Sequence, residues 1–328
     1  MSKRWYWLYP MAACVAMLPF TAVNAQDTGF GNLTLPTQTS NAGHGSFSIG
    51  YSRPFYHGDY GGPAGINSGQ VQFQVATLSA SYFLTDHWEV RASIPFVRGK
   101  SDGLQQHFQL PCPPPGGNLG QCVPTRVDDG HYHGTWADWD FGLGYFTVIG
   151  DNYYVTPTLD VYIPSHNYPY YGAAIVGERV THYGIGVQLQ HQFDFSNFYY
   201  TVVYQYVIKP VIHGFNSNYN ELAIDVGYFI NPKLGVRLIT DTKIGNGLDD
   251  TELNASIATP DGPPDFNQGT LWPIHDKIRK QDHAIVGFAV DYALSARNEM
   301  TFSALRSIWG RDNARLQNGI ALTLTHGF

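Results

Sequence analysis

The chain carries few charged residues and no long apolar segment after its first 25 residues. Lys, Arg, Asp and Glu make up 14% of its 328 residues, against roughly 25% in ordinary soluble domains. No later stretch approaches the roughly 20 apolar residues of a membrane helix, which excludes a helical membrane protein. The net charge of −7 argues against nucleic acid as a partner.

Cysteine is scarce as well, with three in the whole chain. Cys14 lies in an N-terminal segment that we expect to be removed, which leaves Cys112 and Cys122. These two bracket Pro113–Gly120, a Pro- and Gly-rich stretch that can form neither strand nor helix. In an oxidising compartment they predict one disulfide that closes a long loop. A metal site would need further soft ligands nearby, and only scattered histidines are available, so we predict no metal and no cofactor.

The N-terminus has the features of a secretory signal peptide. Lys3 and Arg4 precede a mostly apolar stretch over residues 5–20, and Val23-Asn24-Ala25 forms a small-x-small cleavage site. Cleavage after Ala25 would leave a mature chain over 26–328, which we expect to be one domain.

The C-terminal residues alternate between two kinds of side chain, and only Asn318 and His326 break the apolar parity. One parity holds Leu316, Ile320, Leu322, Leu324 and Phe328, and the other holds Gln317, Gly319, Ala321, Thr323 and Thr325. This period of two predicts a strand with one apolar face. Bacterial outer-membrane barrels commonly end on such a strand with a terminal Phe, which resembles the signal read by the barrel-assembly machinery.

Comparable alternation recurs along the mature chain and predicts twelve strands, an even number as bacterial single-chain barrels have. Without membrane helices, a membrane protein must form a closed barrel, because every backbone polar group needs an internal partner. The connections alternate between short turns, expected in the periplasm, and mostly long loops, expected outside. The short set is 85–87, 149–152, 194–197, 230–233 and 295–298, and the other set is 55–69, 98–135, 164–178, 209–219, 245–282 and the short 310–313. The sequence therefore predicts an all-β, antiparallel transmembrane barrel.

Two details of the pattern carry further expectations. The apolar parity slips after Val71, Phe73 and Val75, which indicates either a bulge or a stretch of small residues.

Aromatic residues predict girdles at the two membrane borders. We expect Trp136, Tyr168, Tyr170 and Tyr171 at the outer border, and Trp88, Tyr153 and Phe198 at the inner one.

The parity opposite to the apolar face carries polar side chains, which a lumen accepts far more cheaply than lipid does. The candidates for lining the lumen are Arg91, Asp138, Asp140, Asp160, Gln188, Asp225, Arg237, Asp241 and Lys243. Two interpretations remain open. Acids and bases can pair across a narrow, largely filled interior, or they can form a polar path whose charges select a solute.

Two loop motifs could bind a metal. His131 and His133 point the same way if they lie on a strand, and Asp249-Asp250-Thr251-Glu252 could bind calcium or bridge lipopolysaccharide through divalent ions. Two ligands make a weak signal and acidic loops are usually solvated, so ordinary surface loops are favoured in both cases.

Several stretches resemble the family of exported barrels named for the MetA pathway of phenol degradation and often labelled transporters. The similar segments are Ser48–Tyr51, Ala80–Phe96, Ala137–Gly144 and Thr158–Pro164. The resemblance implies a barrel linked to uptake of hydrophobic or aromatic compounds, and it supplies no functional residues. The family's usual Gly before the Asp is Ala137 here, and Ser165 follows Pro164.

The sequence as a whole predicts a channel in the outer membrane of a Gram-negative bacterium that passes a small organic solute by diffusion. The expected partners are outer-membrane lipid, lipopolysaccharide, the barrel-assembly machinery and the solute. One alternative is a non-transporting structural or adhesion barrel that uses its long loops. A second is a lipid-modifying enzyme, but no Ser and His lie in the order that such enzymes require, so we expect no catalytic residues.

Overall fold

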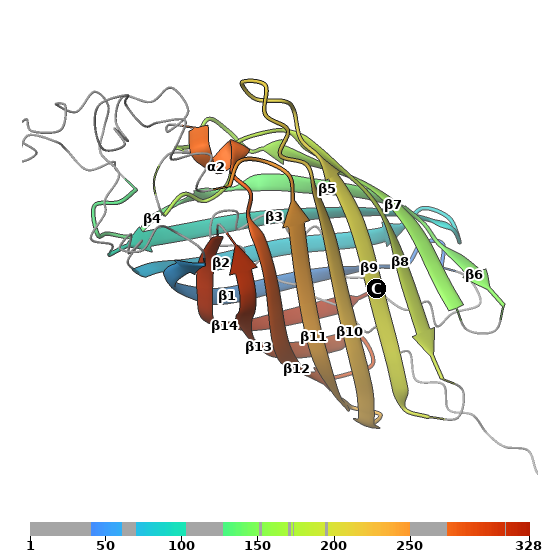
Figure 1. Cartoon of the computed structure of the whole chain (residues 1–328). Helices are drawn as coiled ribbons and strands as arrows, with labels where there is room; N and C mark the ends of the chain where they lie inside the picture. The colour runs from blue at the N-terminus through green and yellow to red at the C-terminus, as the bar shows by residue number, and fades with distance from the viewer. Residues whose placement is uncertain are drawn as a thin grey trace, which may run out of the picture.

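The computed structural model describes residues 41–60, 70–102, 127–150, 153–169, 172, 174–193, 196–249, 274–311 and 313–328. One antiparallel sheet closes on itself around a central axis (Figure 1). The strands are β1 (Gly45–Tyr60), β2 (Gln70–Phe83), β3 (Trp88–Ser101), β4 (His133–Trp136), β5 (Asp138–Tyr145), β6 (Thr147–Ile149), β7 (Tyr153–Pro164), β8 (His182–Gln192), β9 (Phe198–Ile208), β10 (Tyr219–Asn231), β11 (Leu234–Gly245), β12 (Asp282–Ala293), β13 (Asn298–Arg311) and β14 (Asn313–Gly327). A short helix, α2 (His275–Ile278), precedes β12.

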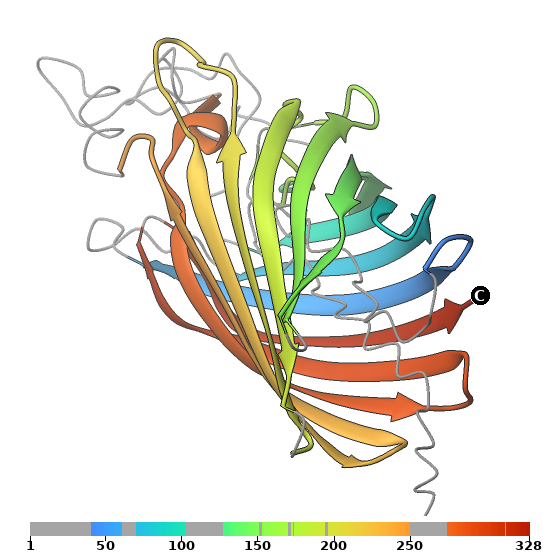
Figure 2. The ribbon, with the colours of Figure 1, turned by 90° about the vertical axis from the view of Figure 1, so that its right-hand side faces the viewer.

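These segments build a wall of twelve strands, which confirms the prediction. β4 and β5 are two parts of one strand interrupted at Ala137, and β6 is a short extension that pairs with β7. The ring closes where β1 pairs with β14 on one side and β2 on the other. Figure 2 shows the short turns at the end that carries the C-terminus, and α2 with the loop between β9 and β10 at the opposite end. We name these the periplasmic and extracellular ends.

The outward parity forms an apolar belt around the barrel. On β14 it exposes Ile320, Leu322, Leu324 and Phe328, while Thr323 and Thr325 of the other parity are buried. Such a continuous apolar surface on a closed wall is stable only against lipid, since large exposed apolar patches are rare on soluble proteins. Trp88, Tyr153 and Phe198, expected at the periplasmic border, are all exposed. No helix among the described residues has the length and apolar character needed to cross a membrane.

The extracellular part of β2 differs from the expectation. β2 pairs with β1 and β3 without any register shift, so the slip in parity is not a bulge. Val71, Phe73 and Val75 instead point inward and are almost fully buried, while Gln70, Gln72 and Gln74 take the outward parity. Apolar side chains therefore change from the outside of the wall to the inside along one uninterrupted strand.

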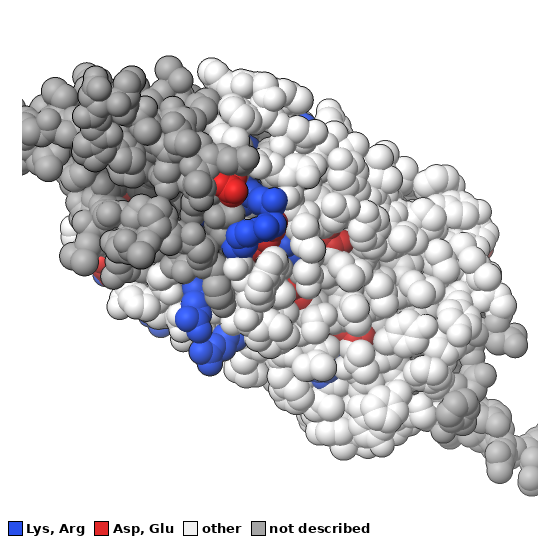
Figure 3. Space-filling model, viewed as in Figure 1, with Lys and Arg blue, Asp and Glu red and all other residues white. Residues whose placement is uncertain are grey.

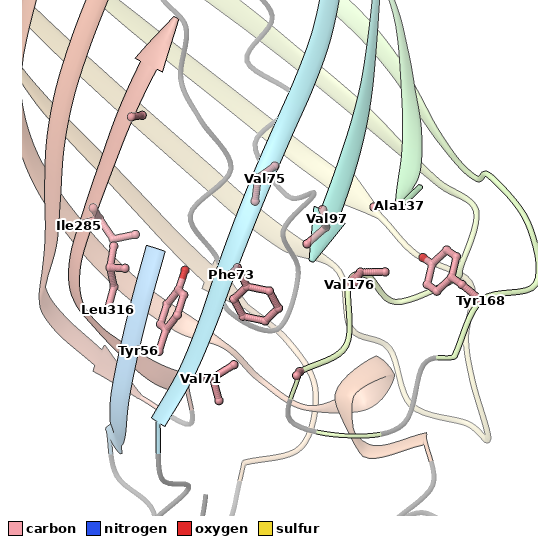
Figure 4. Packing of buried hydrophobic residues seen from close by; sticks show 12 residues of the cluster. Tyr56, Val71, Phe73, Val75, Val97, Ala137, Tyr168, Val176, Ile285 and Leu316 are labelled. Atoms are coloured by element: carbon pink, nitrogen blue, oxygen red, sulfur yellow. The ribbon is translucent and has the colours of Figure 1, made fainter. Parts of the chain in front are cut away.

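The inward-facing apolar residues form a cluster at the extracellular end, which we call the inner apolar cluster: Tyr56, Val71, Phe73, Val75, Val97, Ala137, Tyr168, Ala174, Val176, Ile285, Leu316 and Ala321. Figure 4 shows Tyr56 and Phe73 close together on β1 and β2, with Val176 and Tyr168 from the loop after β7 beside Val97 and Ala137. The rings of Tyr56 and Phe73 meet edge to face, with centroids 6.1 Å apart. On β2 this end has apolar side chains inside and polar ones outside, as expected where a strand rises out of the bilayer into water.

Two residues of this cluster were expected elsewhere. Leu316 was expected to face lipid, but the β1–β14 register shifts between Phe55 and Tyr56 and turns Leu316 inward, to 1% exposure. Tyr168 was expected in the outer girdle and is instead buried beneath its loop. Trp136 is exposed as expected. The predicted signal peptide, the Cys112–Cys122 pair and most of the 249–252 acidic segment lie outside the described residues and stay predictions.

Candidate functional site in the barrel lumen

All nine predicted lumen residues lie on the inner side of the wall. Eight are buried: Arg91, Asp138, Asp160, Gln188, Asp225, Arg237, Asp241 and Lys243. Asp140 is partly exposed, although one of its carboxylate oxygens is buried. Four of the nine belong to two networks on different parts of the wall.

The first network is centred on Arg91 of β3. Its Nη2 lies 2.8 Å from Oδ1 of Asp160 on β7. Gln205 Nε2 donates to Asp160 Oδ2 at 2.9 Å, and Tyr162 Oη donates to Gln205 Oε1 at 3.1 Å. The Tyr162 ring stacks on His182, with centroids 4.4 Å apart. A base, an acid, an amide and a phenol thus share one chain of hydrogen bonds that spans β3 to β9.

The second network is centred on Arg237 of β11. It makes two parallel hydrogen bonds to Asp291 of β12, Nε to Oδ2 at 2.7 Å and Nη2 to Oδ1 at 2.9 Å. Its Nη1 donates to Asp225 Oδ2 of β10 at 2.7 Å. Thr301 Oγ1 also donates to Asp291 Oδ1 at 2.8 Å. The Arg237 guanidinium has little freedom to move, because Nε and Nη2 bind the Asp291 carboxylate in parallel and Nη1 binds Asp225.

Glycines on the inner face leave room for these polar side chains to lie along the wall, because a glycine has no side chain of its own. A Cβ at Gly142 would stand 2.3 Å from Asp160 Oδ1 and 3.0 Å from Arg91 Nε. A Cβ at Gly227 would stand 2.1 Å from the Tyr199 ring. The ion pairs therefore join strands that are neighbours, or next neighbours, along the wall. Of the two interpretations of the inward charges, acid–base pairing is present in these two networks, and it runs along the wall.

Asp241 and Lys243 of β11 belong to a third group nearer the extracellular end. Asp241 Oδ2 lies 3.3 Å from His283 Nε2. Lys243 Nζ stands over the Tyr219 ring, 4.1 Å from its centroid, and Lys209 Nζ approaches the same ring at 4.9 Å. Two ammonium groups thus approach one aromatic ring, and the ring quadrupole attracts both.

The sequence did not predict that the loop between β7 and β8 enters the barrel. Among its described residues, which we call the inner loop (165–169, 172 and 174–181), Tyr168, Ala174, Ile175 and Val176 are almost completely buried. Tyr168 Oη donates a short hydrogen bond to Asp138 of β5 and accepts one from the backbone N–H of Arg179 at 2.8 Å. Burial, with the Asp138 carboxylate beside it, raises the pKa of the Tyr168 hydroxyl, so the hydroxyl stays protonated and donates. The apolar run Ala174-Ile175-Val176 inside a long loop was the available signal.

Further contacts seat the inner loop on the wall. The backbone N–H of Ala174 donates to Asp128 Oδ1 at 3.1 Å. A Cβ at Gly99 would stand 2.5 Å from the Ala174 carbonyl oxygen, so only glycine permits this close approach of loop and β3. Lys209 Nζ lies 2.5 Å from Glu178 Oε1, and both side chains are buried. The inner loop is thus held by the Lys209–Glu178 ion pair, by hydrogen bonds that include Tyr168–Asp138 and Ala174–Asp128, and by apolar packing.

Carboxylates outnumber bases on the inward parity of the described strands. The acids are Glu89, Asp138, Asp140, Asp160, Glu221, Asp225, Asp241, Asp291 and Glu299, and the bases are Arg91, Arg237 and Lys243. Since field lines are focused by low-dielectric walls, such an excess favours cations and disfavours anions inside the barrel.

His133 of the His131–His133 pair contacts an acid. Its Nε2 lies 2.8 Å from Asp129 Oδ1, which also accepts the backbone N–H of His131 at 2.9 Å. Slight burial raises the pKa of Asp129, but these hydrogen bonds outweigh it and hold the pKa below its ordinary value. Across the part of the chain that the structure describes, no three His, Cys, Asp or Glu side chains are grouped to hold a metal.

No family model and no curated protein matches the chain. Among solved structures, an outer-membrane channel from Pseudomonas putida F1 is similar at a TM-score of 0.61 and 12% identity, covering 90% of this chain and 97% of that one. The NanC porin reaches 0.45 at 12% identity, covering 85% and 98% of the two chains. The P. putida toluene transporter TodX reaches 0.41 at 11% identity, covering 87% and 90%. At 12% identity the first similarity establishes the fold, and with the apolar belt it identifies the chain as a twelve-stranded β-barrel of the Gram-negative outer membrane.

Proposed function

We propose that the barrel is a channel for passive passage of a small organic solute that is neutral or cationic. The observation that carries this proposal is the arrangement of the lumen's polar groups along the wall. Arg91 and Arg237 pair with acids on nearby strands, and inward glycines leave room for those side chains to lie flat. A barrel filled only for stability needs no such arrangement, because apolar packing replaces buried ion pairs at little or no loss of stability.

The order of surfaces along the lumen supports a solute with an apolar body and one polar group. At the extracellular end the solute would meet the inner apolar cluster, including Tyr56 and Phe73. Deeper in, it would meet the hydrogen-bonding groups around Arg91 and Arg237. Weakly polar aromatic compounds have both features, and the resemblance to barrels of phenol degradation supports the same class. The excess of carboxylates would disfavour acids.

In this proposal the described structure is the closed state of the channel. The lumen side chains are nearly inaccessible, with Arg237 at 2% and Asp225 at 0% exposure. The inner loop covers the extracellular side of the lumen through Tyr168–Asp138 and Lys209–Glu178. Opening would require these contacts to break while the inner apolar cluster separates from the wall.

Single-channel recording in planar bilayers tests the proposal. We expect discrete conductance steps, a reversal potential in a KCl gradient that reports preference for K⁺, and faster entry of neutral phenols than of benzoates into protein-containing liposomes. A barrel with no steps and no solute flux would refute the channel.

A non-transporting barrel is the second candidate, favoured by the same low exposure of the lumen. It predicts that deletion of the inner loop leaves the membrane as tight to ions as before. The channel predicts larger and longer openings in that variant, so one recording separates the two.

The remaining expectations about processing belong to the same proposal. Export would follow cleavage after Ala25, and the terminal strand β14 would be read by the barrel-assembly machinery. The Cys112–Cys122 disulfide would close an extracellular loop. These features suit an outer-membrane channel and also any other barrel of this membrane.

A further inference from the structure

Charge is sorted between the two sides of the barrel wall. Where strand side chains are described, the Asp and Glu residues take the inward parity except Asp282, at the start of β12, which lies opposite Arg311. Six bases take the outward parity: Arg53 on β1, Arg98 and Lys100 on β3, Arg306 and Arg311 on β13, and Arg315 on β14. The charge of Lys100 is offset by Asp102, whose Oδ2 lies 2.9 Å from its Nζ, and that of Arg311 by Asp282, whose Oδ2 lies 2.5 Å from its Nη2. Arg53, Arg98 and Arg306 have no ion-pair partner among the described residues.

Arg53 and Arg306 lie at a similar height in the outer part of the apolar belt, where Ile308 and Trp309 are still exposed beyond Arg306. On β1 the outward residues are Phe47, Ile49 and Tyr51 before Arg53, and on β13 they are Met300, Phe302 and Ala304 before Arg306. Arg53 and Arg306 each stand eight residues beyond the periplasmic start of their strands, Gly45 and Asn298. At about 3.3 Å per residue and a tilt of roughly 40°, this is about 20 Å along the membrane normal, close to the top of an apolar band about 25 Å tall.

The arginines also lie on one side of the barrel. β13, β14, β1, β2 and β3 are successive neighbours, so at about 4.8 Å between strands the patch is roughly 20 Å wide. Figure 3 shows Lys and Arg atoms toward the extracellular end of the face that carries β11–β13, which adjoins this patch at β13. The Arg98 side chain is held in place without a ligand, because its guanidinium stands 5.4 Å from the centroid of the Tyr132 ring and donates to Gln74 Oε1 at 3.4 Å.

We propose that Arg53, Arg98 and Arg306, which we call the basic rim, bind the phosphate groups of lipopolysaccharide in the outer leaflet. The phosphates of that lipid lie at the level where acyl chains end and sugars begin, which is the level of the basic rim. A guanidinium presents a planar fork that matches phosphate oxygens. Asn318 and Gln74, exposed or half-exposed between the arginines, are suited to bond sugar hydroxyls. The basic rim is independent of the lumen, so this assignment stands whether or not the barrel conducts.

Lipid binding to the folded barrel in detergent micelles tests the assignment. The probe is lipid A with two phosphates, titrated against the full mature protein and against an Arg53→Gln/Arg306→Gln variant, with retention measured by native mass spectrometry. Exposed charge contacts contribute up to about 1 kcal/mol each, so we expect roughly tenfold weaker binding by the variant. We also expect the wild-type affinity to fall as NaCl is raised.

A Lys233→Gln/Arg297→Gln variant is the matched control, because it removes the same charge from exposed residues at the periplasmic turns. Equal weakening in this control would overturn the assignment, and so would equal binding of lipid A without phosphates. Equal binding of phosphatidylglycerol would also overturn it, by showing that the rim accepts any anionic headgroup. Heat-dependent migration on gels verifies that each variant is folded. An Arg53→Lys/Arg306→Lys variant should bind lipid A more tightly than the glutamine variant and less tightly than the wild type, because it keeps the charge and loses the planar fork.

Discussion

Replacing Tyr168 by Phe tests the proposed closure of the lumen with the loss of one oxygen atom. That oxygen donates to Asp138 and accepts from the backbone N–H of Arg179. A hydrogen bond to a charged group contributes about 1.5–3 kcal/mol. At about 1.4 kcal/mol per factor of ten, its loss shifts the balance between closed and open barrels by roughly 10- to 100-fold. The ring itself stays, so packing within the inner apolar cluster changes little.

Single-channel recording measures this shift as open probability. We expect Tyr168→Phe to be open far more often than the wild type at the same voltage, with the same conductance per opening. Tyr132→Phe is the matched control, because it removes a phenol oxygen that bonds Gln72 Oε1 at 2.9 Å at the same end of the barrel. If the two variants open equally often, the bond to Asp138 does not hold the lumen closed.

Three further predictions concern stability and chemistry. Arg237→Met should lower the free energy of unfolding in detergent by about 3–5 kcal/mol, because two carboxylates lose their partner; adding Asp225→Asn and Asp291→Asn should restore most of it, and a triple variant as weak as the single one would contradict this account. The bonds from His133 and His131 hold the pKa of Asp129 below its ordinary value, so their stabilisation is present above that value and is lost as pH falls through the lowered pKa; NMR titration should show His133→Gln raising the pKa of Asp129. Non-reducing digestion should release the two cysteines of the mature chain in one linked peptide pair, and separate free-thiol peptides would exclude the disulfide.

The sequence predicted the barrel because a membrane wall imposes one rule on every strand that crosses it. Residues such as Leu322 and Thr323 must face opposite environments, so a period of two is visible without any knowledge of strand pairing. The same rule predicted that Arg91, Asp160 and Arg237 face the lumen and not the lipid.

The errors arose where that rule ends. Above the bilayer, water replaces lipid outside, so Val71 and Phe73 are buried by facing inward, and alternation alone cannot tell these two environments apart. Leu316 was assigned from the parity of the later residues of its strand, but the register shift between Leu316 and Asn318 reverses the side that the residues before it face. The partners of Arg237 depend on register between strands, which local sequence does not encode. The burial of Tyr168 could not be predicted without knowing that its loop enters the barrel.

The pairing of β1 with β14 has a consequence for how the protein must be made. Ser48 and Thr325 share a hydrogen bond at 2.9 Å across 277 residues of chain, and Gly45 and Phe328 exchange two backbone bonds. Until these two strands meet, both present open edges that can pair with other chains. The ring therefore cannot form progressively during synthesis. Its closing step must wait until the last strand has been delivered, and the unfinished edges need protection throughout that interval.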